Sequence, residues 1–118
     1  MRSVSPVRFG TDGWRDVIGA DFTFTNVRRV SQATADYFQH QQTRTTKKLI
    51  VIGFDRRFLS NEFAETIAEV LTGNGFEVVL SDAPVPTPAV SWLVSELKGR
   101  AGVMITASHN PARFNGIK

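Results

Sequence analysis

The sequence predicts an α/β domain in which helices cover both faces of a largely parallel sheet, giving a three-layer α/β/α sandwich. Two observations predict this fold. Continuous apolar runs at 49–54 and 101–105 are typical of strands that are covered on both faces. Segments with helical spacing of apolar residues separate the expected strands, in the order β-α-β-α-β-α-β. With 118 residues, of which 42% are hydrophobic, the chain can form one domain with its own core.

The first half of the chain is expected to hold two strands and one helix. Residues 7–9 are a short strand candidate, and a turn signal at 12–13 follows it. Thr25 can cap a helix that runs from 26 to about 41, because its apolar residues recur at helical spacing. A polar loop then leads to the buried strand at 49–54.

The second half is expected to hold two helices and two strands. Ser60 can cap the first of these helices, and Gly73 or Gly75 ends it, so that Gly73-Asn74-Gly75 is interpreted as a helix stop and not as a phosphate-binding loop. A strand at 76–80 follows. Thr87 fits the N-cap and Pro88 the first helical position of the last helix, which precedes the 101–105 strand.

Charge and composition argue against several classes of protein. The net charge is +3, and the basic residues are scattered without the interleaved aromatics of a nucleic-acid surface. No apolar run approaches the ~20 residues that cross a bilayer, and the N-terminus has no apolar region of a secretory signal. The chain has no cysteine, which excludes disulfides and thiolate metal sites. We therefore expect a cytoplasmic protein that binds neither nucleic acid nor membrane.

The most informative segment is Thr106-Ala107-Ser108-His109-Asn110-Pro111, directly after the last apolar run. It places a hydroxyl beside an imidazole where a central strand ends, which is where open α/β sheets bind ligands. Lys118 adds a cation nearby in sequence. A serine in a turn often only shapes that turn. A serine hydrolase would need a Gly-x-Ser-x-Gly elbow, and the residues that flank Ser108 lack it.

Three motifs together resemble the α-D-phosphohexomutase family, which includes phosphoglucomutase and phosphomannomutase. The Ser108 segment, followed by Asn-Gly-Ile-Lys at 115–118, is similar to the family's phosphoserine loop. Phe-Gly-Thr-Asp-Gly-Trp-Arg at 9–15 resembles its N-terminal signature, and 53–57 matches a Gly-x-Asp-x-Arg pattern. The motifs fall in the expected order, and the resemblance extends along the whole chain from Val7.

The resemblance implies that residues 1–118 are domain 1 of a four-domain isomerase, with domains 2–4 absent from this chain. It implies a mixed, four-stranded sheet with one antiparallel strand. Such an enzyme interconverts hexose 1-phosphate and hexose 6-phosphate, of glucose or mannose, through a phosphoserine and a bisphosphorylated sugar. Carried over to this sequence, Ser108 is the phosphoryl carrier, Arg15 a cation beside it, and His109 and Lys118 candidate proton-transfer groups.

The same resemblance implies one Mg²⁺, for which this chain offers only the phosphate on Ser108, because the family's Asp-Gly-Asp-Gly-Asp loop lies in domain 2. The chain alone is accordingly expected to be inactive. Two alternatives stay open: a module that binds phosphate or sugar phosphate, and an inactive structural fragment. Asp55 and Arg57 can form a loop ion pair or act directly in the site, and Trp14 is expected to pack and not to bind sugar.

Overall fold

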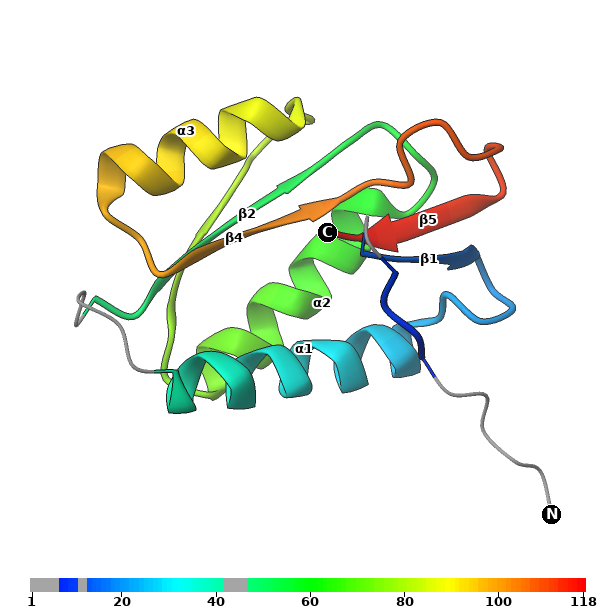
Figure 1. Ribbon diagram of the computed structural model, residues 1–118. Helices are drawn as coiled ribbons and strands as arrows, with labels where there is room; N and C mark the ends of the chain where they lie inside the picture. The colour runs from blue at the N-terminus through cyan, green and yellow to red at the C-terminus, as the bar shows by residue number, and fades with distance from the viewer. Residues whose placement is uncertain (1–6, 11–12, 42–46) are drawn as a thin grey trace, which may run out of the picture.

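The computed structural model describes residues 7–10, 13–41 and 47–118. Three helices and five strands form within this part of the chain (Figure 1). In chain order they are β1 (Trp14–Val17), α1 (Phe24–His40), β2 (Leu49–Phe54), α2 (Ser60–Gly73), β3 (Glu77–Leu80), α3 (Thr87–Leu97), β4 (Ala101–Ile105) and β5 (Phe114–Ile117).

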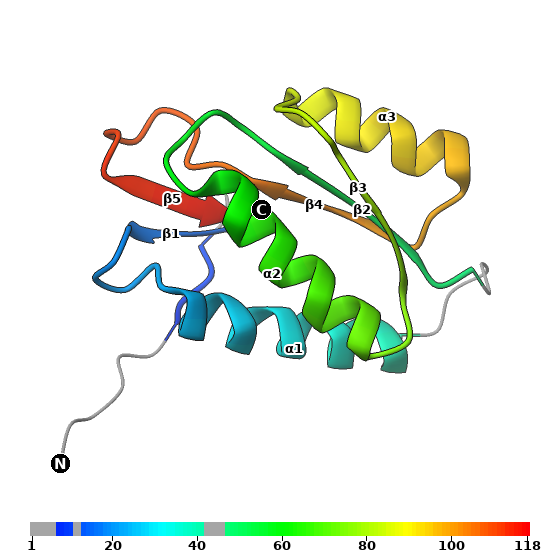
Figure 2. The same ribbon diagram turned by 180° about the vertical axis from the view of Figure 1, so that it is seen from behind.

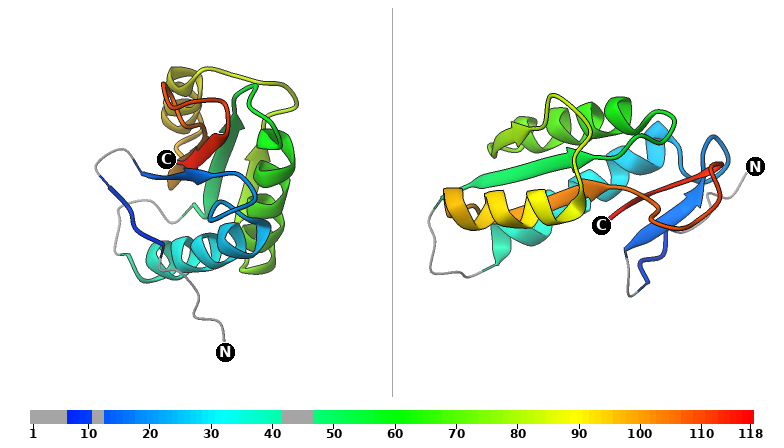
Figure 3. Two further views of the ribbon diagram at one scale, coloured as in Figure 1. Left: turned by 90° about the vertical axis from the view of Figure 1, so that its right-hand side faces the viewer. Right: turned by 90° about the horizontal axis from the view of Figure 1, so that it is seen from above.

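The strands form one sheet in the order β1-β5-β4-β2-β3. β2 is parallel to both β3 and β4, whereas β5 runs antiparallel to β4 and to β1. Helices α1 and α2 cover one face of the sheet and α3 covers the other (Figures 2 and 3). The predicted three-layer α/β/α sandwich with a mixed sheet is therefore confirmed.

The number and placement of the strands differ from the prediction. The sheet has five strands and not four, and its first strand is β1 at Trp14–Val17, whereas the candidate at 7–9 is not a strand. Phe9 is 58% exposed, but Trp14 is 1% exposed and packs on Phe22 with ring centroids 4.5 Å apart. Burial of Trp14 thus fixes which segment joins the sheet, and it confirms that Trp14 packs.

Alternate residues of β2 build two hydrophobic layers. Ile50 and Ile52 belong to the larger core, with Phe63 and Ile67 of α2, and Leu49 and Val51 belong to the smaller core under α3. This is the alternation of side chains that a pleated strand imposes. A strand that is buried on both faces at every residue is the reason why 49–54 is continuously apolar.

Three predicted helix caps are displaced. Pro86, and not Thr87, is the N-cap of α3, so Thr87 is already the first residue of that helix. Thr23, and not Thr25, caps α1, since its hydroxyl accepts the Asn26 N–H at 3.2 Å. Ser60 is the first residue of α2, and its hydroxyl donates to Asp55 instead of capping the helix. The predicted stop after α2 is confirmed, because the helix ends at Gly73 and Gly75 has a φ of 89°. Within the described ranges no helix is long and apolar enough to cross a membrane.

Candidate active site

The loop that carries Ser108 joins β4 to β5, and it lies beside the loop that follows β2 (Figure 1). Parallel β2 and β4 end at the same edge of the sheet, so the two loops meet beyond their carboxyl ends. Open α/β sheets bind ligands at this position. The adjacent strand β5 returns antiparallel and pairs with β1, which brings the Arg15 motif to the same edge.

Ser108 lies exposed in this loop with an unusual backbone conformation. Its φ is 49°, which is left-handed and disfavoured for any residue but glycine. The Ser108 N–H donates to the Thr106 hydroxyl at 3.0 Å, and the Asn110 N–H donates to the Ala107 carbonyl at 2.9 Å. These bonds close a tight turn in which the Ser108 hydroxyl faces solvent and the neighbouring strand β1.

Arg15 reaches this turn from β1. Its Nη2 donates to Ser108 Oγ at 3.3 Å, and its Nη1 donates to Asn110 Oδ1 at 3.0 Å. Its Nε is buried without an acceptor among the described residues. The structure thus joins a hydroxyl and a cation that are 93 positions apart in sequence. A permanent charge at Ser108 Oγ suits an anionic group on that oxygen.

Gly116 allows Arg15 to come this close. It lies on β5 between β1 and β4, and its carbonyl accepts the Thr106 N–H at 3.0 Å. A Cβ atom built on Gly116 would lie 2.6 Å from the Trp14 carbonyl oxygen and 2.7 Å from that of Thr106. Only glycine therefore fits between the strand that carries Arg15 and the start of the Ser108 loop.

Arg57 holds the same loop from the other side. Its Nε lies 3.5 Å from Asp55 Oδ2, which is the predicted ion pair. Its Nη atoms donate to four backbone carbonyls. Three lie in the β4–β5 loop, at Ser108 (2.8 Å), Asn110 (2.7 Å) and Pro111 (2.8 Å), and the fourth is that of Phe114, the first residue of β5, at 3.1 Å. The sequence alone allows either the ion pair or a direct role in the site. The structure adds a third role, in which Arg57 ties two loops together.

A buried polar network supports Asp55 from beneath. Asp55 Oδ1 accepts the Arg57 N–H at 3.0 Å and the Ser60 hydroxyl at 2.8 Å. Ser60 Oγ accepts the Asn115 amide at 2.9 Å, and Asn115 Oδ1 accepts the Gly116 N–H at 2.9 Å. Asn115 is fully buried. Sequence reasoning missed the roles of Ser60, Asn110 and Asn115, although Asn115 opens the second half of the serine motif.

The other two predicted site residues differ in their placement. His109 is exposed beside Ser108 in the same turn. Lys118 is carried away by β5, and its backbone N–H and carbonyl both bond to Met104 at 2.9 Å. It lines hollows with residues of α3 and of α1, and within the described part no hydrogen bond or ion pair joins it to Ser108. The structure brings Arg15 and His109 to Ser108, but not Lys118.

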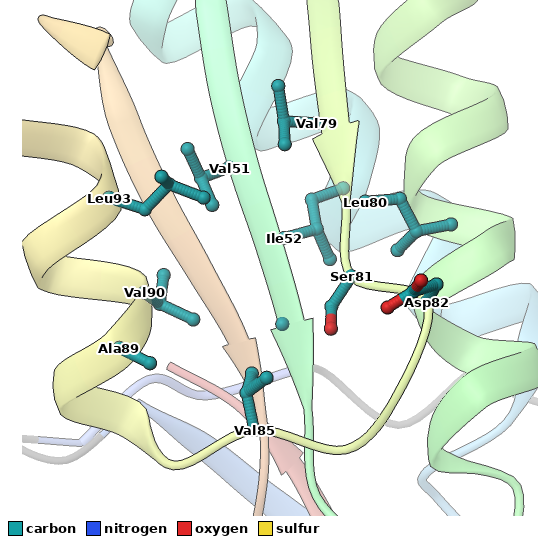
Figure 4. Close-up of a pocket in the computed structure, with 11 residues that line it drawn as sticks. Val51, Ile52, Val79, Leu80, Ser81, Asp82, Val85, Ala89, Val90 and Leu93 are labelled. Carbon is teal, nitrogen blue, oxygen red and sulfur yellow. The ribbon is translucent and has the colours of Figure 1, made fainter. Parts of the chain in front are cut away.

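An apolar hollow of about 360 Å³ lies elsewhere, between α3 and the strands β2 and β3 (Figure 4). Valine and leucine side chains line it, with Ser81 and Asp82 at one end. Ser108 is not among its lining residues, so this hollow is separate from the serine loop. The described residues also contain no group of three or more His, Asp or Glu that could hold a metal ion.

The fold and the serine loop define an α/β domain that presents one hydroxyl to a fixed cation. Residues 6–118 match the family model "Phosphoglucomutase/phosphomannomutase, alpha/beta/alpha domain I". The chain belongs to this family.

Relatives of known name agree with this assignment. The chain is 42% identical over 113 residues to a phosphoglucomutase of Staphylococcus saprophyticus, covering 93% of this chain and 20% of that protein. It is 44% identical over 115 residues to a "Probable phosphoribomutase" of Schizosaccharomyces pombe, covering 95% and 20%. A solved structure from Thermus thermophilus, described as a "putative phosphomannomutase", superposes with a TM-score of 0.91 at 41% identity, covering 98% of this chain and 26% of that one. The chain thus spans about a fifth of the length of these curated relatives.

Proposed function

We propose that this chain is the phosphoryl-carrying first domain of a phosphohexomutase, with Ser108 as the carrier. The observation that carries the proposal is the 3.3 Å contact between Arg15 Nη2 and Ser108 Oγ in an exposed, left-handed turn. A stand-alone phosphate-binding module is a weaker candidate, because binding alone needs no hydroxyl in that position. Family membership and the length of the relatives support a domain of a longer enzyme.

The proposed reaction passes one phosphoryl group between Ser108 and a sugar. A free sugar hydroxyl attacks the phosphorus of phosphoserine, the bond from phosphorus to Ser108 Oγ breaks, and a sugar bisphosphate forms. The sugar bisphosphate then reorients in the site, and Ser108 Oγ attacks the phosphorus of the other phosphate, so that the serine regains a phosphoryl group and the sugar oxygen leaves. Arg15 offsets the charge that builds on the transferring group, since such transfer depends mainly on positioning and electrostatics.

Proton transfer is assigned to groups near Ser108. The attacking sugar hydroxyl must lose a proton, and the leaving serine oxygen must gain one. His109 adjoins Ser108 in the turn and is exposed, so that a sugar placed at Ser108 could reach it. Lys118 is the second candidate. Its backbone is paired with Met104 of β4, so the segment that holds Lys118 would have to move for its ammonium group to reach Ser108.

A magnesium ion would need ligands that this part of the chain does not supply. The described residues hold no cluster of metal-ligating side chains, so only a phosphate oxygen on Ser108 could contribute from here. We assign the further ligands to domains 2–4 of the longer enzyme, which are also the proposed partners of this domain. No step above depends on the metal.

The relatives carry names that point to phosphoglucose, phosphomannose and phosphoribose substrates. We propose a hexose phosphate, in a cytoplasmic enzyme of carbohydrate metabolism, with a pentose phosphate as the second candidate because of the phosphoribomutase relative.

The experiment is a coupled assay of the full-length protein with glucose 1-phosphate, mannose 1-phosphate and ribose 1-phosphate, each with Mg²⁺. The Ser108→Ala variant is the control. Turnover that depends on Ser108 with at least one sugar phosphate is expected. Equal turnover by the Ser108→Ala variant would refute the carrier role.

A further inference from the structure

Arg57 uses its whole guanidinium to hold one loop. A guanidinium carries five N–H donors in a rigid fork. Three of them go to carbonyls of the β4–β5 loop, one goes to the carbonyl of the first residue of β5, and the fifth faces Asp55. The side chain is 14% exposed. Arg57 therefore has no free donor with which to bind a phosphate unless it releases the loop.

The carbonyls that Arg57 holds lie directly after the strained residue. Ser108 has a left-handed φ of 49°, and the carbonyls of Ser108 and Asn110 share the Nη2 atom of Arg57 at 2.8 and 2.7 Å. Those bonds fix the Ser108–His109 peptide plane, which directly follows Ser108 Cα, and the Asn110–Pro111 peptide plane two residues on. A disfavoured backbone conformation persists only when its surroundings over-determine it. The Thr106 hydroxyl holds the peptide before Ser108, and Arg57 holds those after it.

The direction of Ser108 Oγ depends on this backbone conformation. If φ of Ser108 relaxed to a right-handed or extended value, its Cβ would turn and Oγ would leave Arg15. We propose that Arg57 is a positioning residue for phosphoryl transfer, which keeps Ser108 in the left-handed turn and so aims Oγ at Arg15. This inference rests on the proposed function. Arg57 acts through the backbone, because its guanidinium bonds to carbonyls and to Asp55 and not to Ser108 Oγ.

Charge alone does not explain this arrangement. Arg56 carries the same charge one residue earlier, but its exposed guanidinium donates to none of these carbonyls in the described structure. A lysine at position 57 would keep the charge, yet an ammonium is a single point with three donors and cannot span four carbonyls. Arg57→Lys should therefore behave like Arg57→Ala, and Arg56→Ala should not.

The first test uses the full-length protein. We expect kcat to fall on the order of 10²-fold in both Arg57→Ala and Arg57→Lys, because a misplacement of about 1 Å at a reacting atom costs about that much. KM for the sugar phosphate should stay near its wild-type value, and so should kcat in Arg56→Ala. If Arg57→Lys retains wild-type kcat, or if KM rises while kcat is kept, the positioning role is wrong.

The second test uses the 118-residue chain itself and needs no activity. Backbone chemical shifts and HN–Hα couplings of ¹⁵N,¹³C-labelled protein report φ at Ser108. In Arg57→Ala and Arg57→Lys, Ser108 should leave the left-handed region while the signals of β2 and α2 persist, and in Arg56→Ala it should stay. A Ser108 that remains left-handed without Arg57 overturns the inference. If the wild-type full-length protein shows no Ser108-dependent turnover, the proposed function fails, and this measurement still decides what Arg57 does.

Discussion

Gly116→Ala should destabilise the chain and loosen the site, because the added methyl group has no space between two backbones. Its Cβ would lie 2.6 Å from the Trp14 oxygen and 2.7 Å from the Thr106 oxygen. An ordinary carbon–oxygen contact is about 3.3 Å, so the backbone of β1 and that of Thr106, directly after β4, must each move by roughly 0.6–0.7 Å. Overpacking of this kind costs about 1–3 kcal/mol. We expect a loss near 3 kcal/mol, because backbone oxygens cannot rotate away as a side chain would.

Gly73→Ala is the matched control for this substitution. Gly73 is the last residue of α2, and a Cβ there has nothing within 4 Å. Alanine should stabilise that position by about 0.5–1 kcal/mol. Urea unfolding of the two variants measures both effects as shifts of the midpoint in opposite directions at constant m. Gly116→Ala with a midpoint at or above the wild-type value would refute the packing argument.

Three further outcomes follow from the same contacts. Asn115→Ala should lower the free energy of unfolding in urea by about 2–4 kcal/mol, since it leaves the buried Gly116 N–H without an acceptor and creates a cavity. Asn61→Ala, at an exposed position, should lower it by under about 0.5 kcal/mol, and equal losses in the two variants would contradict the buried network. Arg15→Ala in the full-length protein should lower kcat by about 10²–10³-fold, and Arg28→Ala on the exposed face of α1 should not; a kcat that survives the loss of Arg15 would refute its electrostatic role. The 118-residue chain alone should show no Ser108-dependent turnover of glucose 1-phosphate with Mg²⁺ in a coupled assay, because its described residues supply no cluster of metal ligands to position the substrate. Ser108-dependent turnover by this chain would show that it is a complete mutase by itself.

The layers of the fold could be predicted from sequence because burial leaves a pattern. β2 is apolar at every residue since both of its faces are covered, and α1 and α2 each show a buried stripe. β5 leaves no such pattern. Its residues are Phe-Asn-Gly-Ile, and Asn115 and Gly116 are chosen for a buried amide and a close backbone contact. A strand whose residues are determined by contacts with neighbouring elements cannot be recognised from its own composition.

The candidate site was predicted in part for a similar reason. The exposed serine and the cation at Arg15 are carried by short motifs, and the resemblance places them together. The hydrogen bonds from Arg57 to the Ser108 loop could not be predicted, because their acceptors are backbone carbonyls, which any residues would supply once the loop has its shape. The position of Lys118 cannot be predicted without knowing that residues 114–117 form a strand antiparallel to β4, which places Lys118 beside Met104 and away from Ser108.

The central claim is that Ser108 carries the phosphoryl group, and its most direct test is to locate that group. Purified full-length protein is incubated with a hexose bisphosphate, and intact mass and peptide mapping then identify the phosphorylated residue. One added phosphate on Ser108, absent from the Ser108→Ala variant, is the predicted result. The Ser60 hydroxyl is 1% exposed and bonded to Asp55 and Asn115, and Ser81 lies at the end of the separate apolar hollow. A phosphate on either of these serines, with Ser108 unmodified, would contradict the account.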